Sequence, residues 1–310
     1  MTSAEVRPIH LDTDPGLDDL LAIALALALP ELRVDALTTV AGNACIDRVT
    51  ENAQRFAALA GLALPIGRGA AEPLALSRCD AAHFHGEDGR RGVSIPALDR
   101  RPVETAASVL RARLAAHGVR CVVALGPLTN LATLAREQPT LLEGIEIVWM
   151  GGALQGGNVT PVAEFNAYAD PQALSTLLDS AAALRVIPLE VTETVALREA
   201  DVGEQPFGAS ELGRTLEAVL RALMEAERPT AGEARASLHD PCAVLAATRR
   251  DLFRYEEKVI RIQVDESSDR GRLSELPAGS GRTVHYAVEA RADEIKRIFL
   301  DGLRRLGEAA

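Results

Sequence analysis

A run of carboxylates follows the first apolar segment of this chain. Residues 9–11 are of strand type, and four aspartates occur within the next eight residues. Pro15 and Gly16 then lead into a helix-like apolar segment at residues 20–29. Carboxylates that meet at a strand end, beside a buried element, repel one another unless a cation, a shared proton or hydrogen bonds compensate. The four residues are Asp12, Asp14, Asp18 and Asp19.

Two interpretations of these aspartates are open. Asp-Pro-Gly is ordinary turn chemistry, and Asp18 or Asp19 at a helix start would favour the helix dipole without any further role. A bound divalent metal is the simplest compensation for all four aspartates together. Oxygen ligands of this kind indicate a hard cation, calcium or magnesium, rather than zinc.

Composition narrows the class of ligand. The net charge of −11 and the isoelectric point near 5.1 argue against a general nucleic-acid or anionic-membrane binder, because clustered Lys and Arg supply most of the affinity for phosphate. Residues 1–10 lack a secretory signal pattern, and the apolar segment 20–29 is too short to span a bilayer. We therefore expect a cytoplasmic protein that binds a small, neutral or weakly charged molecule.

The cysteines agree with that location. They are widely spaced and form no CxxC pair, so we interpret them as reduced, buried thiols. The four are Cys45, Cys79, Cys121 and Cys242.

Strand-like and helix-like segments alternate along the chain. This alternation predicts an α/β fold with a mainly parallel central sheet flanked by helices, and an active site at the carboxyl ends of the strands. The chain has no linker or internal repeat, which favours a single domain over residues 1–310. We expect strands at 34–40, 64–67, 119–125, 145–150 and 184–191, and helices at 46–60, 104–117, 212–227 and 292–306.

Polar groups follow several of these strands. Asn43 comes after the strand at 34–40, where turn chemistry alone could also explain it. Further along, Asn158, Glu164 and Asn166 offer amide and carboxylate groups suited to neighbouring hydroxyls, although each could equally stabilise a loop. The polar loop that contains His83 and His85 has no matching Cys or His cluster for zinc, so a surface loop is the simpler interpretation there.

Three motifs in the chain resemble those of one enzyme family. The run from Asp12 to Asp19 resembles the amino-terminal signature of the inosine-uridine preferring nucleoside hydrolases, and residues 157–171 are similar to the second signature of that family. His239 and Asp240, before Pro241, resemble its last motif. The resemblance implies calcium-dependent hydrolysis of the N-glycosidic bond of purine or pyrimidine ribonucleosides.

The resemblance also implies a metal site and a catalytic pair. Asp14, Asp19, Asp240 and the carbonyl of Leu125 would hold Ca²⁺. Many members have Thr where this chain has Leu125, but a backbone ligand tolerates the change. Asp14 would take a proton from the attacking water, and His239 would assist the departing base.

The implied substrate contacts come from six residues. The ribose 5′-hydroxyl would meet Asn158 and Glu164, and the 2′- and 3′-hydroxyls would meet three more side chains. His85 would lie near the base. The residues implied for the 2′- and 3′-hydroxyls are Asp18, Asn43 and Asn166.

The chain departs from the family at two places. Glu190 and Glu193 occur where Asp and often His are found, which puts a supporting loop in doubt but not the metal site. The loop at 228–238 lacks the Tyr that several members use to reach the base, so preference between purine and pyrimidine stays open. The family also implies a homodimer or homotetramer.

Two other functions are open. Asp12-Thr13-Asp14 superficially matches the Asp-x-Asp motif of haloacid dehalogenase-type phosphatases, which use an aspartyl nucleophile and usually a lysine for the phosphate charge. The other alternative is a non-catalytic nucleoside-binding protein that kept the pocket.

Overall fold

The apolar run near the amino terminus forms β1 (Arg7–Thr13), at the middle of the sheet. Successive side chains of a strand point to opposite faces, and both faces of β1 are buried from Ile9 onward. His10 and Asp12 share one face, where both bond to the hydroxyl of Thr38. β1 is therefore a fully covered strand with a polar network on one side.

Ten strands form one sheet in the computed structural model, which describes residues 6–98, 102–116, 118–203, 207–228 and 233–310. All neighbours from β12 to β4 are parallel, and β10 runs antiparallel to β11 and β12. In order, the strands are β11 (Leu273–Leu276), β10 (Phe253–Ile262), β12 (Val284–Ala290), β7 (Ala183–Ile187), β6 (Glu146–Met150), β5 (Cys121–Ala124), β1, β2 (Leu32–Thr39), β3 (Ile66–Arg68) and β4 (Glu104–Thr105).

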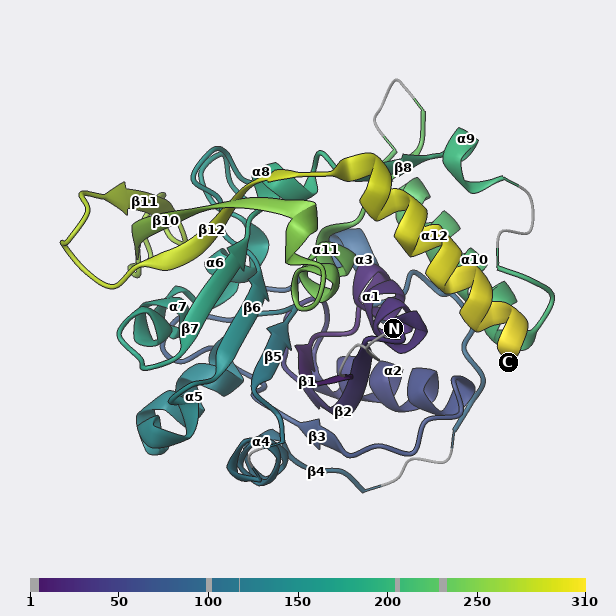
Figure 1. Cartoon of the computed structure of the whole chain (residues 1–310), viewed down its shortest axis with the longest axis horizontal. Helices are drawn as coiled ribbons and strands as arrows, with labels where there is room; N and C mark the ends of the chain where they lie inside the picture. The colour runs from purple at the N-terminus through teal and green to yellow at the C-terminus, as the bar shows by residue number, and fades with distance from the viewer. Residues whose placement is uncertain (1–5, 99–101, 117, 204–206, 229–232) are drawn as a thin grey trace, which may run out of the picture.

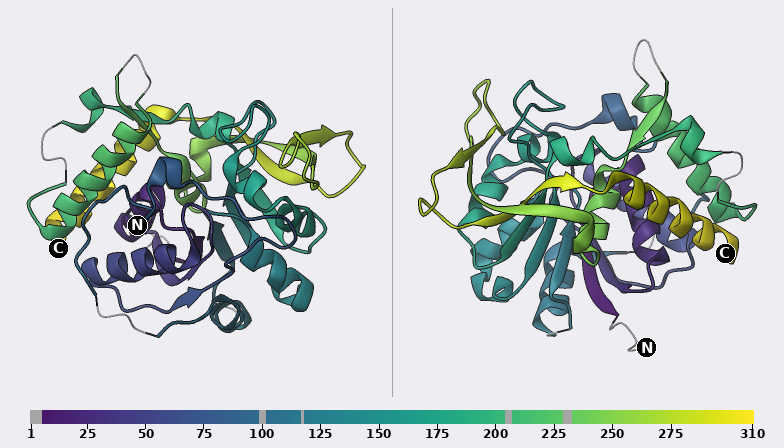
Figure 2. Two further views of the ribbon diagram at one scale, coloured as in Figure 1. Left: turned by 180° about the vertical axis from the view of Figure 1, so that it is seen from behind. Right: turned by 45° about the horizontal axis from the view of Figure 1, so that its top comes forward.

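Helices cover both faces of this sheet (Figures 1 and 2). One face carries α1 (Leu17–Ala28), α2 (Ile46–Leu59), α10 (Glu211–Ala226), α11 (His239–Ala246) and α12 (Ala292–Ala309). The other carries α4 (Ala106–Ala115), α5 (Thr129–Glu137) and α7 (Pro171–Leu178). Shorter elements are α3 (Ala82–His85), α6 (Phe165–Ala169), α8 (Leu189–Thr192), α9 (Glu199–Val202), η1 (Pro139–Leu142), η2 (Arg250–Leu252) and the pair β8 (Ala196–Arg198) and β9 (Arg235–Ser237).

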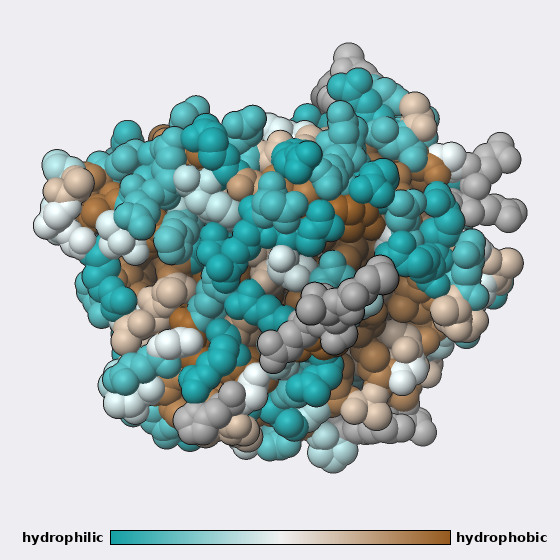
Figure 3. Space-filling view, viewed as in Figure 1, coloured by the Kyte–Doolittle hydropathy of each residue, from teal (hydrophilic) through white to brown (hydrophobic). Residues whose placement is uncertain are grey.

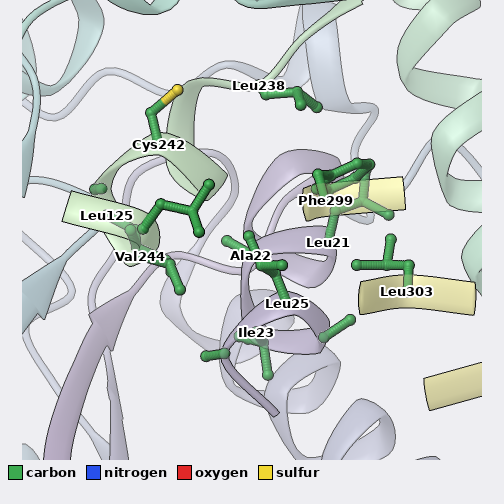
Figure 4. Packing of buried hydrophobic residues seen from close by; sticks show 14 of the residues in the cluster. Leu21, Ala22, Ile23, Leu25, Leu125, Leu238, Cys242, Val244, Phe299 and Leu303 are labelled. Atoms are coloured by element: carbon green, nitrogen blue, oxygen red, sulfur yellow. The ribbon is translucent and has the colours of Figure 1, made fainter. Parts of the chain in front are cut away.

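Helix α1 lies inside the larger core. It is apolar on nearly all sides, as expected of a helix that other elements enclose. Figure 4 shows Leu21 and Leu25 of α1 close to Phe299 and Leu303 of α12. Because α1 packs against α10, α11 and α12, its first turn is held in a fixed place at the carboxyl end of β1.

Most predicted elements are confirmed. The α/β architecture with a mainly parallel sheet agrees with the expectation, and the expected helices 46–60, 212–227 and 292–306 match α2, α10 and α12 closely. The strands expected at 34–40 and 145–150 match β2 and β6.

Two predicted boundaries are wrong. The strand expected at 184–191 ends at Ile187, because Pro188 starts the short helix α8. The helix expected from Glu104 begins at Ala106, since Glu104 and Thr105 pair with β3 and Thr105 caps the helix.

The segment expected as a loop at 228–238 contains a short strand. Arg235–Ser237 pairs as β9 with β8, and residues 229–232 lie outside the described residues.

The cysteines are only partly as expected. Cys121 and Cys242 are buried free thiols, and burial raises the pKa of the Cys121 thiol to about 12. Cys79 is half-buried and Cys45 is exposed, so the prediction of burial is wrong for Cys45. The exposed sulfur follows from its place before the first turn of α2.

The outer surface is mostly polar. Figure 3 shows hydrophilic residues over most of one face, with smaller hydrophobic areas between them. No helix in the described ranges combines the length and apolar character needed to cross a membrane.

A cluster of charges joins the amino ends of several strands, opposite the strand ends that carry the acidic run. Glu146, at the start of β6, pairs with Arg7 at 2.6 Å, Arg185 at 3.0 Å and Arg250 at 2.7 Å. Burial alone would raise the pKa of Glu146, but the hydrogen bonds from Arg7 and Arg185 and the charges of Arg185 and Arg250 lower it. The ionised carboxylate therefore stabilises the fold.

We expect Glu146→Gln to lower the free energy of unfolding by about 1–3 kcal/mol at pH 7, because three guanidinium groups lose their shared partner. A carboxylate with a lowered pKa contributes stability above its unfolded value and loses it as pH falls through the folded pKa. The difference between wild type and variant should therefore shrink as pH falls below 4.5. Urea denaturation across this pH range measures it.

Glu137→Gln is the matched control, since Glu137 forms an exposed pair with Arg111. A control variant as unstable as Glu146→Gln, or a difference that does not depend on pH, would contradict this role for Glu146.

Candidate active site

A pocket of about 250 Å³ lies beyond the carboxyl ends of the parallel strands. The strand order reverses direction at β1, between β5 and β2, and such switch points form the ligand crevices of open α/β sheets. Nine of the eleven predicted site residues line this pocket: Asp18, Asn43, His85, Leu125, Asn158, Glu164, Asn166, His239 and Asp240.

The other two, Asp14 and Asp19, are buried and bonded to the lining residue Asn43. The backbone N–H of Asn43 donates to Asp14 Oδ2 at 2.7 Å, and its side-chain amide donates to Asp19 Oδ2 at 2.8 Å. Asp19 also accepts the N–H of Gly16 at 3.0 Å, at the start of α1. The helix-start interpretation of Asp19 is therefore correct, and it coexists with a place in the acidic cluster.

Two glycines allow the backbone to approach Asp14. A β-carbon at Gly42 would lie 2.0 Å from Asp14 Oδ2, and one at Gly126 would lie 2.4 Å from Asp14 Oδ1. Any larger residue at either position would displace the carboxylate. Both glycines are therefore needed for the position of the Asp14 carboxylate, and neither was selected as a site residue from the sequence.

Asp12 does not join the other aspartates. Its Oδ1 accepts from Thr38 and from the side-chain amide of Asn130 at 2.8 Å, beneath the strand end. It belongs to the polar network on one face of β1, because it lies within the strand, two residues before Asp14.

A compact acidic cluster remains. Among the described residues, carboxylate oxygens of Asp18, Asp19 and Asp240 lie within 4.8 Å of one another. This set differs from the predicted metal ligands, which have Asp14 in place of Asp18. Burial, followed by the charges of Asp19 and Asp18, raises the pKa of Asp14 well above its usual value.

Burial and neighbouring negative charges also act on Asp240. Burial, then the charges of Asp18, Asp19, Asp14 and Glu164, raises its pKa well above the usual value. One oxygen each of Asp14 and Asp18 is buried without a hydrogen-bond partner among the described residues. Buried carboxylates with unpaired oxygens, repelling one another, fit a hard divalent cation.

Leu125 lines the same pocket, and its carbonyl is held by Asn166. It accepts the side-chain amide of Asn166 at 2.8 Å, and the same amide donates to the carbonyl of Met150 at 3.0 Å. Asn166 thus ties the ends of β5 and β6 together. Since a carbonyl oxygen has two lone pairs, the one on Leu125 retains capacity for a second partner.

Glu164 and Asn158 shape the neighbouring wall. The Glu164 carboxylate caps α6, accepting the N–H groups of Asn166 at 2.8 Å, Ala167 at 3.0 Å and Gly152 at 2.6 Å. Burial raises the pKa of Glu164, although these three bonds oppose the shift. Asn158 accepts the N–H of Phe165 at 2.9 Å. Loop-stabilising roles are therefore present at both residues, within the pocket wall.

His85 lies beside Asp18 in the pocket lining. The N–H of Leu17 donates to His85 Nδ1 at 3.2 Å, so a neutral ring carries its hydrogen on Nε2, which lies 4.0 Å from Asp18 Oδ1. Burial, then the positive charges of His83 and Arg91, lowers the pKa of His85 to about 3. The ring is neutral near pH 7.

His239 begins α11 beside Asp240. Its Nδ1 lies 2.7 Å from the hydroxyl of Thr192, a residue of α8 that the sequence analysis did not select. Burial, then the charge of Arg235, lowers the pKa of His239 to about 4.

Further lining residues went unpredicted because no motif marks them. Glu227 and Ser237 bond to each other, with Ser237 N–H and hydroxyl donating to the two Glu227 oxygens at 2.8 and 2.7 Å. Arg235 lies 3.6 Å from Glu227. Glu190, which departs from the family pattern, accepts hydrogen bonds from the hydroxyl of Tyr286 at 2.7 Å and the N–H of Leu154 at 3.2 Å. It therefore connects α8 with β12 and with the loop after β6.

Comparisons with known proteins agree with this geometry. Residues 9–297 match the family model described as inosine-uridine preferring nucleoside hydrolase. The non-specific ribonucleoside hydrolase RihC of Escherichia fergusonii is 38% identical over 249 residues, 79% of this chain and 80% of that protein.

Two solved structures are also similar. A purine-preferring ribonucleoside hydrolase from Gardnerella vaginalis has a TM-score of 0.91 and 28% identity, over 98% of this chain and 100% of that one. A plant nucleoside hydrolase has a TM-score of 0.89 and 30% identity, over 96% and 99%. Sequence, fold and site together show that the chain belongs to the inosine-uridine preferring nucleoside hydrolase family.

Proposed function

We propose that this chain hydrolyses the N-glycosidic bond of ribonucleosides to ribose and free base, with Ca²⁺ as cofactor. Family membership supports the reaction. The observation that carries the proposal is the convergence of an acidic cluster, hydroxyl-binding side chains and a histidine on one pocket. One relative is named non-specific and a structural neighbour purine-preferring, so the proposal covers both base classes.

The cation would be held by Asp14, Asp19, Asp240 and the carbonyl of Leu125, with Asp18 beside them. The raised pKa values and unpaired oxygens of this cluster support a divalent ion there. When bound, such a cation lowers the pKa of a coordinated water.

The ribose would lie against the polar wall. Asp18, Asn43 and Asn166 would meet the 2′- and 3′-hydroxyls, and Asn158 and Glu164 the 5′-hydroxyl. Carboxylate oxygens accept from hydroxyls, and amides both donate and accept, so this set suits a sugar. His85 would lie near the base, its place beside Asp18 supporting a role at the sugar–base junction.

The chain's own residues would then perform the hydrolysis. Asp14 takes a proton from the water that attacks C1′. As the new C–O bond forms, the C1′–N bond breaks and its electron pair goes to the base. Positive charge develops on the ribose, and the buried carboxylates favour that charge over the neutral ground state. His239 assists the departing base by donating a hydrogen bond, because burial lowers its pKa to about 4 and the ring is neutral near pH 7.

The two alternatives have less support. Five carboxylates line the pocket, against one Arg and no Lys among its described lining residues, which is unfavourable for a phosphate. Asp12, which the phosphatase interpretation needs as nucleophile or partner, is bonded within the sheet. The assays described below distinguish a non-catalytic nucleoside-binding protein from a hydrolase.

Assembly and location stay predictions. The homodimer or homotetramer is what the family resemblance implies, and the cytoplasmic location is an expectation from the sequence. The net charge of −11 likewise supports a ligand other than nucleic acid or a membrane.

We expect Asp14→Asn to bind inosine but to lose turnover by roughly a hundred-fold or more, because the amide cannot accept the water proton. Ribose release measures turnover, and calorimetric titration with inosine measures binding. Asp47→Asn, an exposed change in α2, is the control that keeps wild-type turnover. Ribose release by Asp14→Asn at near the wild-type rate would exclude Asp14 as the base.

We expect EDTA treatment to abolish ribose release from inosine and uridine, and added Ca²⁺ to restore it. Ca²⁺ should also raise the thermal midpoint of unfolding of the wild type, since an ion that binds only the folded state stabilises it. Asp240→Asn should remove most of that increase. Full activity in protein shown to be metal-free by elemental analysis would contradict the metal site, and nucleoside binding without ribose release by Ca²⁺-loaded protein would select the non-catalytic alternative.

A further inference from the structure

Among the described residues, the His239 ring forms a hydrogen bond with one protein group, the hydroxyl of Thr192. Thr192 is fully buried at the end of α8, and its Oγ1 lies 2.7 Å from His239 Nδ1 and 3.1 Å from the carbonyl of Leu189. The two residues are 47 positions apart. Local structure alone therefore does not account for their contact.

A second contact fastens the same two segments. The N–H of Leu238, immediately before His239, donates to the carbonyl of Val195 at 2.8 Å, just beyond α8. The backbone of the His239 segment is thus tied to the α8 segment beside the ring contact. Thr192 and His239 are held at fixed separation.

The contact leaves one ring nitrogen for a ligand. The Thr192 hydroxyl has one hydrogen, and its contact with Nδ1 at 2.7 Å is shorter than its contact with the Leu189 carbonyl at 3.1 Å. When the hydroxyl donates to Nδ1, a neutral His239 ring carries its hydrogen on Nε2. With Nδ1 engaged, Nε2 is the nitrogen of this pocket-lining ring that is available to a bound molecule. A hydrogen bond to one ring nitrogen commonly fixes the orientation of a functional histidine and determines which nitrogen is left for a ligand.

We propose that Thr192 is a positioning residue, which holds His239 so that Nε2 meets the leaving base. The inference rests on the proposed function and adds a residue to it. As the C1′–N bond breaks, its electron pair goes to the base, and Nε2–H donates a hydrogen bond to the base. Without the Thr192 hydroxyl, the ring would turn away and leave the base unassisted.

The test compares two leaving groups. Inosine needs help as hypoxanthine departs, whereas 4-nitrophenyl β-D-ribofuranoside releases 4-nitrophenolate, which departs as a stable anion. We expect Thr192→Val to lower kcat for inosine by roughly ten-fold or more with little change in KM, and to leave kcat for the nitrophenyl riboside near wild type. Thr192→Ser, which keeps the hydroxyl, should restore turnover of inosine.

Thr194→Val is the matched control. Thr194 lies two residues further on, is exposed, and donates to the carbonyl of Val191 at 2.7 Å, so it makes the same kind of local bond as Thr192. It should behave as wild type on both substrates. In a His239→Ala background, Thr192→Val should have no further effect on inosine turnover, because the ring on which it acts is gone.

The outcomes separate cleanly. Equal loss on both substrates, or no loss on either, would overturn the positioning role. Thr192→Ala replaces Thr192→Val if thermal unfolding shows that the valine variant is not folded, and the same pattern is expected. If wild-type protein with Ca²⁺ releases ribose from no nucleoside, the proposed function is refuted. If the wild type is active and Thr192→Val is unaffected, only the positioning role of Thr192 is refuted.

Discussion

Mutual repulsion among buried carboxylates at the end of β1 is the constraint on which the rest of the site depends. The protein compensates some of this charge itself. Asp19 accepts the N–H of Gly16 and the amide of Asn43, and Asp14 accepts the N–H of Asn43. One oxygen each of Asp14 and Asp18 stays unpaired among the described residues, so the compensation is incomplete. An incompletely compensated acidic cluster is suited to a cation and to a substrate that becomes positive.

Such a cluster needs a rigid support, because carboxylates that repel one another would otherwise move apart. Asp18 and Asp19 are on the first turn of α1, and the rest of that helix is enclosed by α10, α11 and α12. Asp240 is on the first turn of α11, which packs against α1. Packing of apolar side chains between two helices therefore fixes the separation of charges at their ends.

The sequence predicted the parts of the fold and site that local chemistry determines. Asp14, Asp18 and Asp19 occur in one run, and alternating segments predict the parallel sheet that places strand ends together. Asp240 could be joined to that run only through family resemblance, since nothing in the spacing connects positions so far apart.

Other features depend on tertiary contacts and leave no pattern. Thr192 meets His239 only because α8 and α11 are adjacent in the fold, and Gly126 matters only because Asp14 is opposite it. The strand expected to reach residue 191 was predicted too long because apolar residues of a short buried helix look like a continuing strand. The physical reason is the same in each case, since burial among distant segments decides what the local sequence leaves open.

The distribution of charge between the two ends of the sheet completes the argument. Arg7, Arg185 and Arg250 gather around Glu146 at the amino ends of the strands. Among the described residues that line the pocket at the carboxyl ends, five are acids and one is an Arg. A phosphorylated ligand would meet repulsion in that pocket, whereas a neutral nucleoside would not. Once the glycosidic bond begins to break, the same acids attract the positive charge of the ribose, so one charge distribution accounts for both the choice of substrate and the stabilisation of the transition state.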